Sequence, residues 1–317
     1  MKQPLKNTAI LLLGLLPAWV CAQDYPVKPV RFLVAFPAGS SMDVITRVVG
    51  PKLSERLGQP VIVENRGGAG GNIAAQVVSR APADGYAVLA TSSAISINVT
   101  LYKNPGFTMD DFIPLLRAGA SPNLIFANPS LPARNLQELF SLAKARPLSY
   151  ASAGTGTGTQ LFMEMLKKET STDITHVPFS PAAAVTAVLG NQAPMGITSM
   201  PMALTHVRSG KLTALAVTTH ARVTALPEVP TVGESGFPGF EDTTWFAFFL
   251  RAGTPEAVVS RLNTELTRVM ELAEVKEKFS ALNVEFTRNS PAEFAEMVRK
   301  EIAKYGKAIR DTGAKAD

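Results

Sequence analysis

Cysteine is almost absent from this chain of 317 residues, and the single one, Cys21, lies near the N-terminus. Disulfides, thiol nucleophiles and cysteine metal sites are therefore excluded for the rest of the chain. Histidine is scarce as well. None of His176, His206 and His220 has another histidine three or four residues away, so the helical zinc motif is missing. We expect neither a metal nor a cofactor.

A strong excess of one charge is also missing. The chain has 31 Lys and Arg against 26 Asp and Glu, which gives a net charge of +5. The basic residues are dispersed and interleaved with acidic ones, which is not typical of a nucleic-acid-binding surface, so we expect no nucleic-acid partner. The mild positive charge would help to attract small anions.

The N-terminus has the pattern of an export signal. Lys2 and Lys6 precede an apolar stretch over 9–17, and Val20-Cys21-Ala22 resembles a small-residue cleavage site. The stretch is shorter than the ~20 residues of a transmembrane helix. We predict cleavage after Ala22, so that residues 1–22 are a signal peptide and the mature protein lies in the periplasm. Two alternatives stay open: an uncleaved anchor, and a lipoprotein lipidated at Cys21.

The hydrophobic pattern of the remaining residues alternates between strands and helices. In the first unit we expect strands at 30–35, 60–64 and 86–90, and helices at 43–57 and 72–79. A second unit has expected strands at 123–128, 148–151, 174–177, 193–198 and 212–218, and helices at 136–145, 160–169 and 182–189. A strand at 244–250 returns to the first unit, and helices at 255–272, 273–282 and 291–312 complete it.

This order predicts an α/β fold with two lobes, each a mainly parallel sheet flanked by helices, and a cleft between them. Lobe 1 would contain residues 23–122 and 246–317, and lobe 2 residues 123–245. Two strands, near 122–124 and 244–248, would cross the hinge.

Three strand-to-helix junctions built from Gly, Ser and Thr give the strongest functional signal, at 36–43, 65–72 and 152–159. A helix N-terminus has unpaired N–H groups and a partial positive charge, and flanking glycines let an anion approach them. The junctions therefore favour a receptor that holds a small anion with its backbone. The alternative is that these residues only form turns and helix caps, and for 65–72 the two interpretations are balanced. The third junction differs from a dinucleotide fingerprint because Thr159 stands where the last glycine belongs.

Several sequence motifs resemble the Bug-type receptors, the periplasmic solute-binding proteins of tripartite tricarboxylate transporters. They lie at 25–31, 36–43, 57–66, 68–73, 84–86, 209–212, 226–231 and 252–255. The resemblance implies a Venus flytrap protein of the type II-like periplasmic-binding fold, which closes on a small carboxylate as a monomer and delivers it to membrane transporter subunits. An exported α/β enzyme that acts on a carboxylate, and a ligand sensor for a signalling partner, remain as alternatives.

The resemblance places the carboxylate between the junctions at 38–43 and 152–160, the two that the residues themselves favour. We expect no catalytic residue. The predicted ligand-binding residues are Phe36, Ala38, Gly39, Ser40, Ser41, Asp43, Ser152, Gly154, Thr155, Gly156, Thr157, Gln160, Phe179 and Thr198. Two departures from the family pattern stand out. Gln160 replaces a frequent His, and Thr198 replaces a common cleft Asp, which disfavours an amino-acid ligand because an ammonium group needs a counter-charge.

Overall fold

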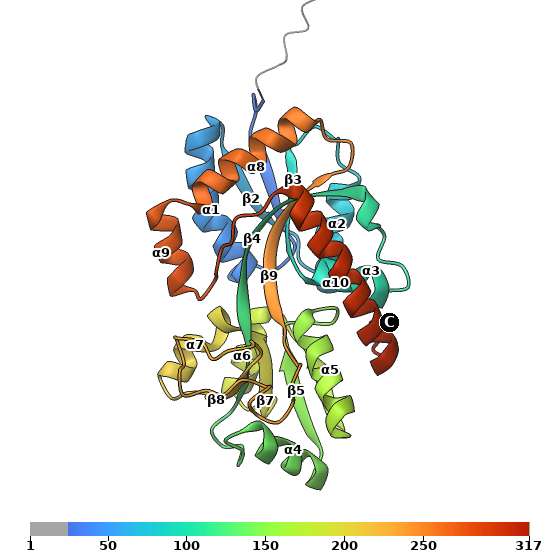
Figure 1. The fold of residues 1–317 in the computed structure, drawn as a ribbon, viewed down its shortest axis with the longest axis vertical. Helices are drawn as coiled ribbons and strands as arrows, with labels where there is room; N and C mark the ends of the chain where they lie inside the picture. Colours follow the sequence, from blue (N-terminus) through green and yellow to red (C-terminus); the bar gives the residue numbers. More distant parts are fainter. Residues whose placement is uncertain (1–24, 317) are drawn as a thin grey trace, which may run out of the picture.

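The structure, a computed structural model, describes residues 25–316. The predicted signal peptide, its cleavage after Ala22 and the state of Cys21 lie outside the described residues. Figure 1 shows two lobes stacked along the longest axis of the molecule and joined by two long strands. This two-lobed α/β architecture agrees with the sequence-based prediction.

Lobe 1 is built around three parallel strands, β1 (Val30–Val34), β2 (Val61–Asn65) and β3 (Ala87–Ser92). Their connections contain α1 (Ser41–Leu57), the short 3-10 turn η1 (Ala69–Gly71) and α2 (Asn72–Ser79). The helix α1 begins two residues earlier than predicted because Ser40 is its N-cap and accepts a hydrogen bond from the amide of Asp43. It ends at Gly58, whose φ of 68° suits a glycine C-cap.

Two strands connect the lobes. The first, β4 (Phe112–Ala127), follows α3 (Ala94–Leu101) and the 3-10 turn η2 (Met109–Asp111), and it pairs with β9 (Thr243–Arg251) up to Pro122. From Asn123 onward β4 pairs with strands of lobe 2. This change of partner supports a hinge at 122–124, which stays a prediction. Because β4 and β9 run antiparallel to their neighbours, the continuous sheet is mixed.

Lobe 2 repeats the strand–helix order of lobe 1. Its strands are β5 (Leu148–Ser152), β6 (Ile174–Pro178), β7 (Met195–Ser199) and β8 (Thr213–Val217). Its helices are α4 (Leu136–Ala145), α5 (Gly158–Thr170), α6 (Pro181–Leu189) and α7 (Met200–Arg208). The strand β5 is parallel to β6 and β7, whereas β7 and β8 are antiparallel to β4.

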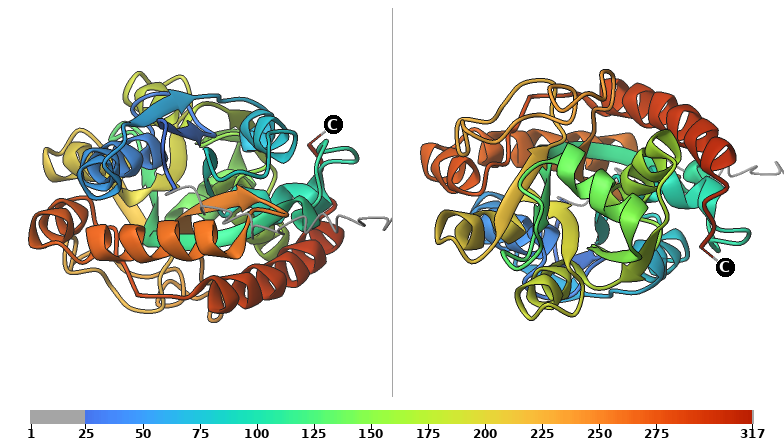
Figure 2. Two further views of the ribbon diagram at one scale, coloured as in Figure 1. Left: turned by 90° about the horizontal axis from the view of Figure 1, so that it is seen from above. Right: turned by 90° about the horizontal axis from the view of Figure 1, so that it is seen from below.

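The C-terminal helices lie mainly against lobe 1. They are α8 (Glu256–Met270), α9 (Ala273–Ala281) and α10 (Pro291–Thr312). Figure 2 shows α8 and α10 as long rods on the outside of the molecule. The helix α10 packs on α3 and β4 and reaches across to α5 of lobe 2.

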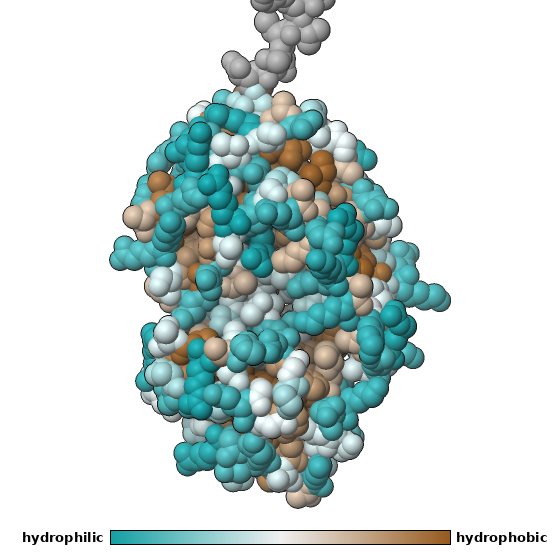
Figure 3. All heavy atoms as spheres, in the orientation of Figure 1, coloured by the Kyte–Doolittle hydropathy of each residue, from teal (hydrophilic) through white to brown (hydrophobic). Residues whose placement is uncertain are grey.

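Hydrophilic side chains cover most of the face drawn in Figure 3. Among residues 25–316, none of the helices combines the length and the apolar character needed to cross a membrane.

Candidate functional site

A cavity between the lobes, called the inner cavity below, is lined by hydroxyl groups and carries no charged side chain. Eight of its fourteen lining residues are Ser or Thr. Lobe 1 contributes Phe36, Ser40, Ser41, Met42, Ser92 and Ser93; lobe 2 contributes Ala153, Thr157, Gly158, Thr159, Pro181 and Ser199; and β9 contributes Thr244 and Phe246. Any solute held here would contact both lobes and one of the strands that join them.

Five helices begin at the inner cavity. The first residues of α1, α5 and α6, and the residues that directly precede α3 and α7, all belong to its lining. The topology explains this convergence, because each of these helices follows a strand whose carboxyl end faces the cleft. The partial positive charges of the helix N-termini therefore favour an anion in the cavity without any cationic side chain.

Donor groups in the inner cavity are left unused. Ser40 and Thr157 cap α1 and α5 by accepting hydrogen bonds from Asp43 and Gln160. The preceding amides of each helix, those of Ser41, Met42, Gly158 and Thr159, have no partner within residues 25–316. The buried hydroxyl of Ser93 has no partner there either. Because unpaired buried polar groups are costly, these groups indicate a place for a hydrogen-bonding ligand.

The lobes touch each other around the inner cavity. The hydroxyls of Ser41 and Ser199 lie 3.0 Å apart across the cleft, and both residues are buried. A second point of contact involves Asn98 of lobe 1, which donates to the carbonyl of Gly70 and to the side chain of Asn72. A Cβ at Gly156 of lobe 2 would lie 2.3 Å from Oδ1 of this same Asn98. Glycine is thus needed where lobe 2 closes on Asn98.

The predicted binding residues fall into three groups. Phe36, Ser40, Ser41 and Thr157 line the inner cavity. Gly154, Thr155 and Phe179 line an adjoining pocket, called the outer pocket below, which also contains Gly68–Gly71 and shares Phe36, Ala153 and Pro181 with the inner cavity. The remaining seven, Ala38, Gly39, Asp43, Ser152, Gly156, Gln160 and Thr198, line neither.

Most of the remaining seven residues shape the junctions. The Asp43 carboxylate accepts hydrogen bonds of 2.9 Å each from the Gly39 amide, Arg47 Nε and Asn65 Nδ2. Burial alone would raise the pKa of Asp43, but these donors outweigh it and hold the pKa below its usual value. In the third junction, Gln160 Oε1 accepts from the Gly156 amide at 2.7 Å.

Two further predicted residues make short-range contacts behind the cavity. The Ser152 hydroxyl lies 2.7 Å from Nε2 of His176, whose pKa burial lowers to about 4, so His176 is neutral at pH 7. Thr198 donates to the carbonyl of Ser199. Ala38 is exposed at the tip of the first junction.

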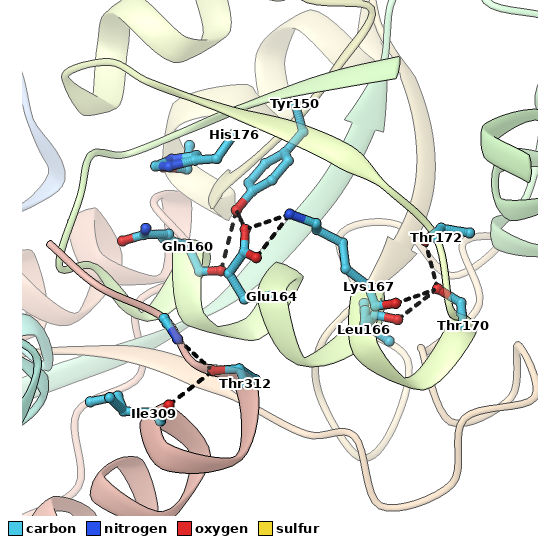
Figure 4. Close-up of polar contacts among 12 residues, drawn as sticks. Tyr150, Gln160, Glu164, Leu166, Lys167, Thr170, Thr172, His176, Ile309 and Thr312 are labelled. Carbon is cyan, nitrogen blue, oxygen red and sulfur yellow. Dashed lines mark hydrogen bonds and ion pairs between the residues drawn. The ribbon is translucent and has the colours of Figure 1, made fainter. Parts of the chain in front are cut away.

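A partly buried polar cluster connects α5 to the sheet of lobe 2. Figure 4 shows Tyr150 on β5 pointing at Glu164 on α5, with Lys167 on the other side of this carboxylate. The Tyr150 hydroxyl donates to Glu164 Oε1 at 2.7 Å, and Lys167 Nζ donates to Oε2 at 2.8 Å. The cluster holds the helix whose N-terminus faces the inner cavity.

Two acids, the buried Asp242 and the partly buried Glu301, lie near the hinge on the α10 side. Burial raises the pKa of Asp242 to about 6 and that of Glu301 to about 7, although Lys304 near both groups and Arg117 near Glu301 oppose these shifts. Tyr305 donates to Asp242 at 2.9 Å, and the Trp245 indole donates to Glu301. The Asn123 amide also donates to Asp242, and Thr244 of the cavity wall donates to Asn123. The acids are thus linked to the crossing strands.

The free energy of unfolding should decrease between pH 5 and pH 8 because folded Glu301 loses its proton in this range. The unfolded chain loses this proton near pH 4.5, whereas the folded protein keeps it until about pH 7. The stability that the protonated group contributes is therefore complete below pH 4.5 and is lost as the pH rises through 7. We expect Glu301→Gln to reduce the loss by roughly 1–3 kcal/mol, measured by urea unfolding at both pH values.

The control for this prediction is Glu296→Gln on the exposed face of the same helix, which should behave like the parent. The lowered pKa of His176 makes the free energy of unfolding rise with pH, which is the opposite direction. This contribution is the same in the parent, Glu301→Gln and Glu296→Gln. An unchanged pH dependence in Glu301→Gln would show that Glu301 ionises normally in the folded state.

Sequence reasoning missed several residues of the inner cavity, above all Ser92, Ser93, Ser199 and Thr244. The first three also end strands and precede helices, but no glycine marks these junctions. The run Thr91-Ser92-Ser93 directly after the predicted strand at 86–90 is the signal that would have found Ser92 and Ser93. Thr244 is the first residue of the predicted strand at 244–250, and no local pattern marks it as a cavity residue.

Comparisons with known proteins identify the family. The model of the tripartite tricarboxylate transporter family receptor (TctC) matches residues 45–314. The protein BugT of Bordetella pertussis is 34% identical over 302 residues, which cover 93% of each chain.

Two solved structures from Rhodopseudomonas palustris are similar over nearly their whole length. Rpa4515, solved with adipate, is 32% identical with a TM-score of 0.87 and covers 92% of this chain and 99% of its own. MatC, solved with bound malate, is 28% identical with a TM-score of 0.86 and covers 90% of this chain and 100% of its own. The chain therefore belongs to the family of tripartite tricarboxylate transporter receptors, as its resemblance to the Bug-type receptors implied.

Proposed function

We propose that this protein is a periplasmic receptor that captures a small organic carboxylate in the inner cavity and delivers it to a tripartite tricarboxylate-type membrane transporter. One observation carries the proposal: five helix N-termini, with unused amide and hydroxyl donors, converge on a cavity between two lobes. Two similar structures were solved with small carboxylates, adipate and malate.

Binding rather than catalysis is the proposed role, because the lining of the inner cavity offers no side chain that would serve as a general acid or base. The carboxylate would be held by backbone amides of α1 and α5 and by serine and threonine hydroxyls. Since these groups come from both lobes, the ligand would bind the closed arrangement more tightly and shift the population toward it.

A thermal-shift screen of mono-, di-, tri- and aromatic carboxylates tests the proposal, because a ligand that binds only the folded protein raises its apparent stability. At least one carboxylate should raise the melting temperature, and the rise should grow with the logarithm of its concentration. No shift with any of them would contradict the proposal.

Recovery of the ligand unchanged after incubation distinguishes a receptor from an enzyme. Loss of uptake on deletion of the gene distinguishes transport from signalling.

The periplasmic location is tested by the mass of the mature N-terminus. Gln23, or its cyclised form, should be the first residue. An intact Met1 or a lipid on Cys21 would contradict the proposed export and cleavage.

The contact between Ser41 and Ser199 should contribute to binding. A neutral hydrogen bond contributes roughly 0.5–1.5 kcal/mol, so Ser41→Ala and Ser199→Ala should each lower affinity by about 2- to 12-fold. Because the two hydroxyls bond to each other, the double variant should lose less than the sum of both losses. Isothermal titration of the four proteins with the best ligand measures this coupling. Fully additive losses would mean that the hydroxyls act separately, without contact in the bound state.

A further inference from the structure

A larger cavity, called the back cavity below, lies on the other face of the strands that cross between the lobes. Its volume is about 620 Å³. Successive side chains of a strand point to opposite faces of the sheet. On β9, Thr244 and Phe246 line the inner cavity, whereas Thr243 lines the back cavity. Pro122 of β4 pairs with Thr243 and lines the back cavity as well. The crossing strands therefore separate the two cavities.

Each lobe supplies one wall of the back cavity. Lobe 1 contributes residues of α9 and of the segment at 283–287, and lobe 2 contributes Thr219, Val223 and Thr224. The lobe 1 wall is attached to β4, since Ala120 and Glu285 exchange two backbone hydrogen bonds of 2.9 and 2.8 Å. In the lobe 2 wall, Arg222 binds Glu234 of the same lobe at 2.8 Å. Each wall would therefore move with its own lobe.

The two walls do not bond to each other in this arrangement. Within residues 25–316, no hydrogen bond or ion pair joins the segment at 219–224 to the segment at 276–287. On the other face of the crossing strands, the Ser41 and Ser199 hydroxyls lie 3.0 Å apart. The lobes are thus in contact on the side of the inner cavity and apart on the side of the back cavity.

Opening of the cleft would reverse this arrangement. When a connection of two strands bends so that the lobes separate on one face, the walls on the opposite face approach each other. Val223 on one wall and Phe279 and Phe286 on the other would then lose apolar surface to each other, which is favourable. The lobe 2 wall has no charged lining residue, so the approach brings no like charges together.

We infer that the two walls of the back cavity meet when the cleft opens, and that their contact limits the opening and stabilises the unliganded receptor. The apparent affinity of a ligand that binds only the closed arrangement falls with the fraction of receptor that is closed. The back cavity therefore sets affinity through residues that touch no ligand. The inference goes beyond the proposed function, because it concerns the unliganded protein and names no ligand.

A tryptophan in the back cavity tests the inference. Thr224 of the lobe 2 wall and Ser280 of the lobe 1 wall are both exposed. In the closed arrangement the cavity has room for an indole ring, but on opening the ring would be caught between the walls. Without ligand, Thr224→Trp and Ser280→Trp should each be more compact than the parent in small-angle scattering. Isothermal titration should show each binding adipate or malate at least threefold more tightly than the parent.

Ala221→Trp and Ala281→Trp are the matched controls, because these exposed residues adjoin the two walls without lining the cavity. Both should behave like the parent. Ligand-free scattering of both cavity variants identical to that of the parent would overturn the inference, and so would affinities no higher than those of the controls. If neither adipate nor malate binds, the scattering of the ligand-free proteins still decides, so a failure of the inference is distinguishable from a failure of the proposed function.

Discussion

Replacement of Gly156 by valine should reduce ligand affinity roughly 100-fold while both lobes stay folded, because backbone strain and overlap together cost a few kcal/mol. The φ of Gly156 is 79°, and a Cβ at this position would lie 2.3 Å from Asn98 Oδ1 and 3.0 Å from the Tyr102 ring. Since Gly156 belongs to lobe 2 and both neighbours belong to lobe 1, the overlap arises only when the lobes come together. Isothermal titration measures the loss, and circular dichroism checks the fold.

Gly239 offers a matched control for this experiment. Its φ is 82°, but no atom lies within 4 Å of a Cβ built there. Gly239→Val therefore introduces similar backbone strain without a contact between lobes, and it should bind ligand like the parent. Equal affinities of the two valine variants would mean that Gly156 is not part of the closing surface.

Leu161→Ala should weaken binding by about 30-fold or more, since a leucine-to-alanine change in a packed core costs ~2–5 kcal/mol. Leu161 of α5 packs in an apolar cluster with Ile97 and Leu101 of α3 and with Tyr305, Ala308 and Ile309 of α10. This cluster joins lobe 2 to lobe 1. We expect its loss to destabilise the closed arrangement in particular, and so to appear in affinity more than in the melting temperature.

The control is Leu166→Ala on the same helix. Leu166 is fully buried in the core of lobe 2 itself. The variant Leu166→Ala should lower the melting temperature and leave ligand affinity nearly unchanged, which is the opposite pattern to Leu161→Ala. If both variants lose affinity equally, the apolar cluster between α5 and α10 has no special role in closure.

The parts of the fold that the sequence predicted are those with a strong local signal. The helices α4 and α10 match their expected bounds because an N-cap residue, Asn135 or Ser290, precedes an amphipathic run. The helix α3 was missed because nearly all of its residues are buried, so it has no polar face to reveal a helical period. The helix α7 was missed because Pro201 resembles a helix breaker, although it lies in the first turn, where proline is tolerated.

The first half of β4 was missed for a similar reason. Pro114, Gly119 and Pro122 interrupt its pattern, and the ladder with β9 contains two irregularities, at 114–116 and 117–119. The strand is nevertheless formed because β9 and the helices of lobe 1 cover it. Such tertiary contacts cannot be seen in a local pattern.

Sequence reasoning for the site was guided by glycine. It led to Ser40, Ser41 and Thr157, which do line the inner cavity, but it also led to residues such as Asp43 and Gln160 that support the junctions from behind. Contacts between lobes depend on residues far apart in the chain, such as Ser41 with Ser199 and Leu161 with Ile309. No local pattern predicts these pairs, because they exist only once two lobes have closed.

A crystal structure of the mature protein with the tightest-binding carboxylate of the thermal-shift screen is the most direct test of the proposed function. We predict a closed protein with one carboxylate group in the inner cavity, bonded to amides at the starts of α1 and α5 and to the free hydroxyl of Ser93. A carboxylate bound elsewhere, or held in the inner cavity by one lobe alone, would contradict a receptor that closes on its ligand.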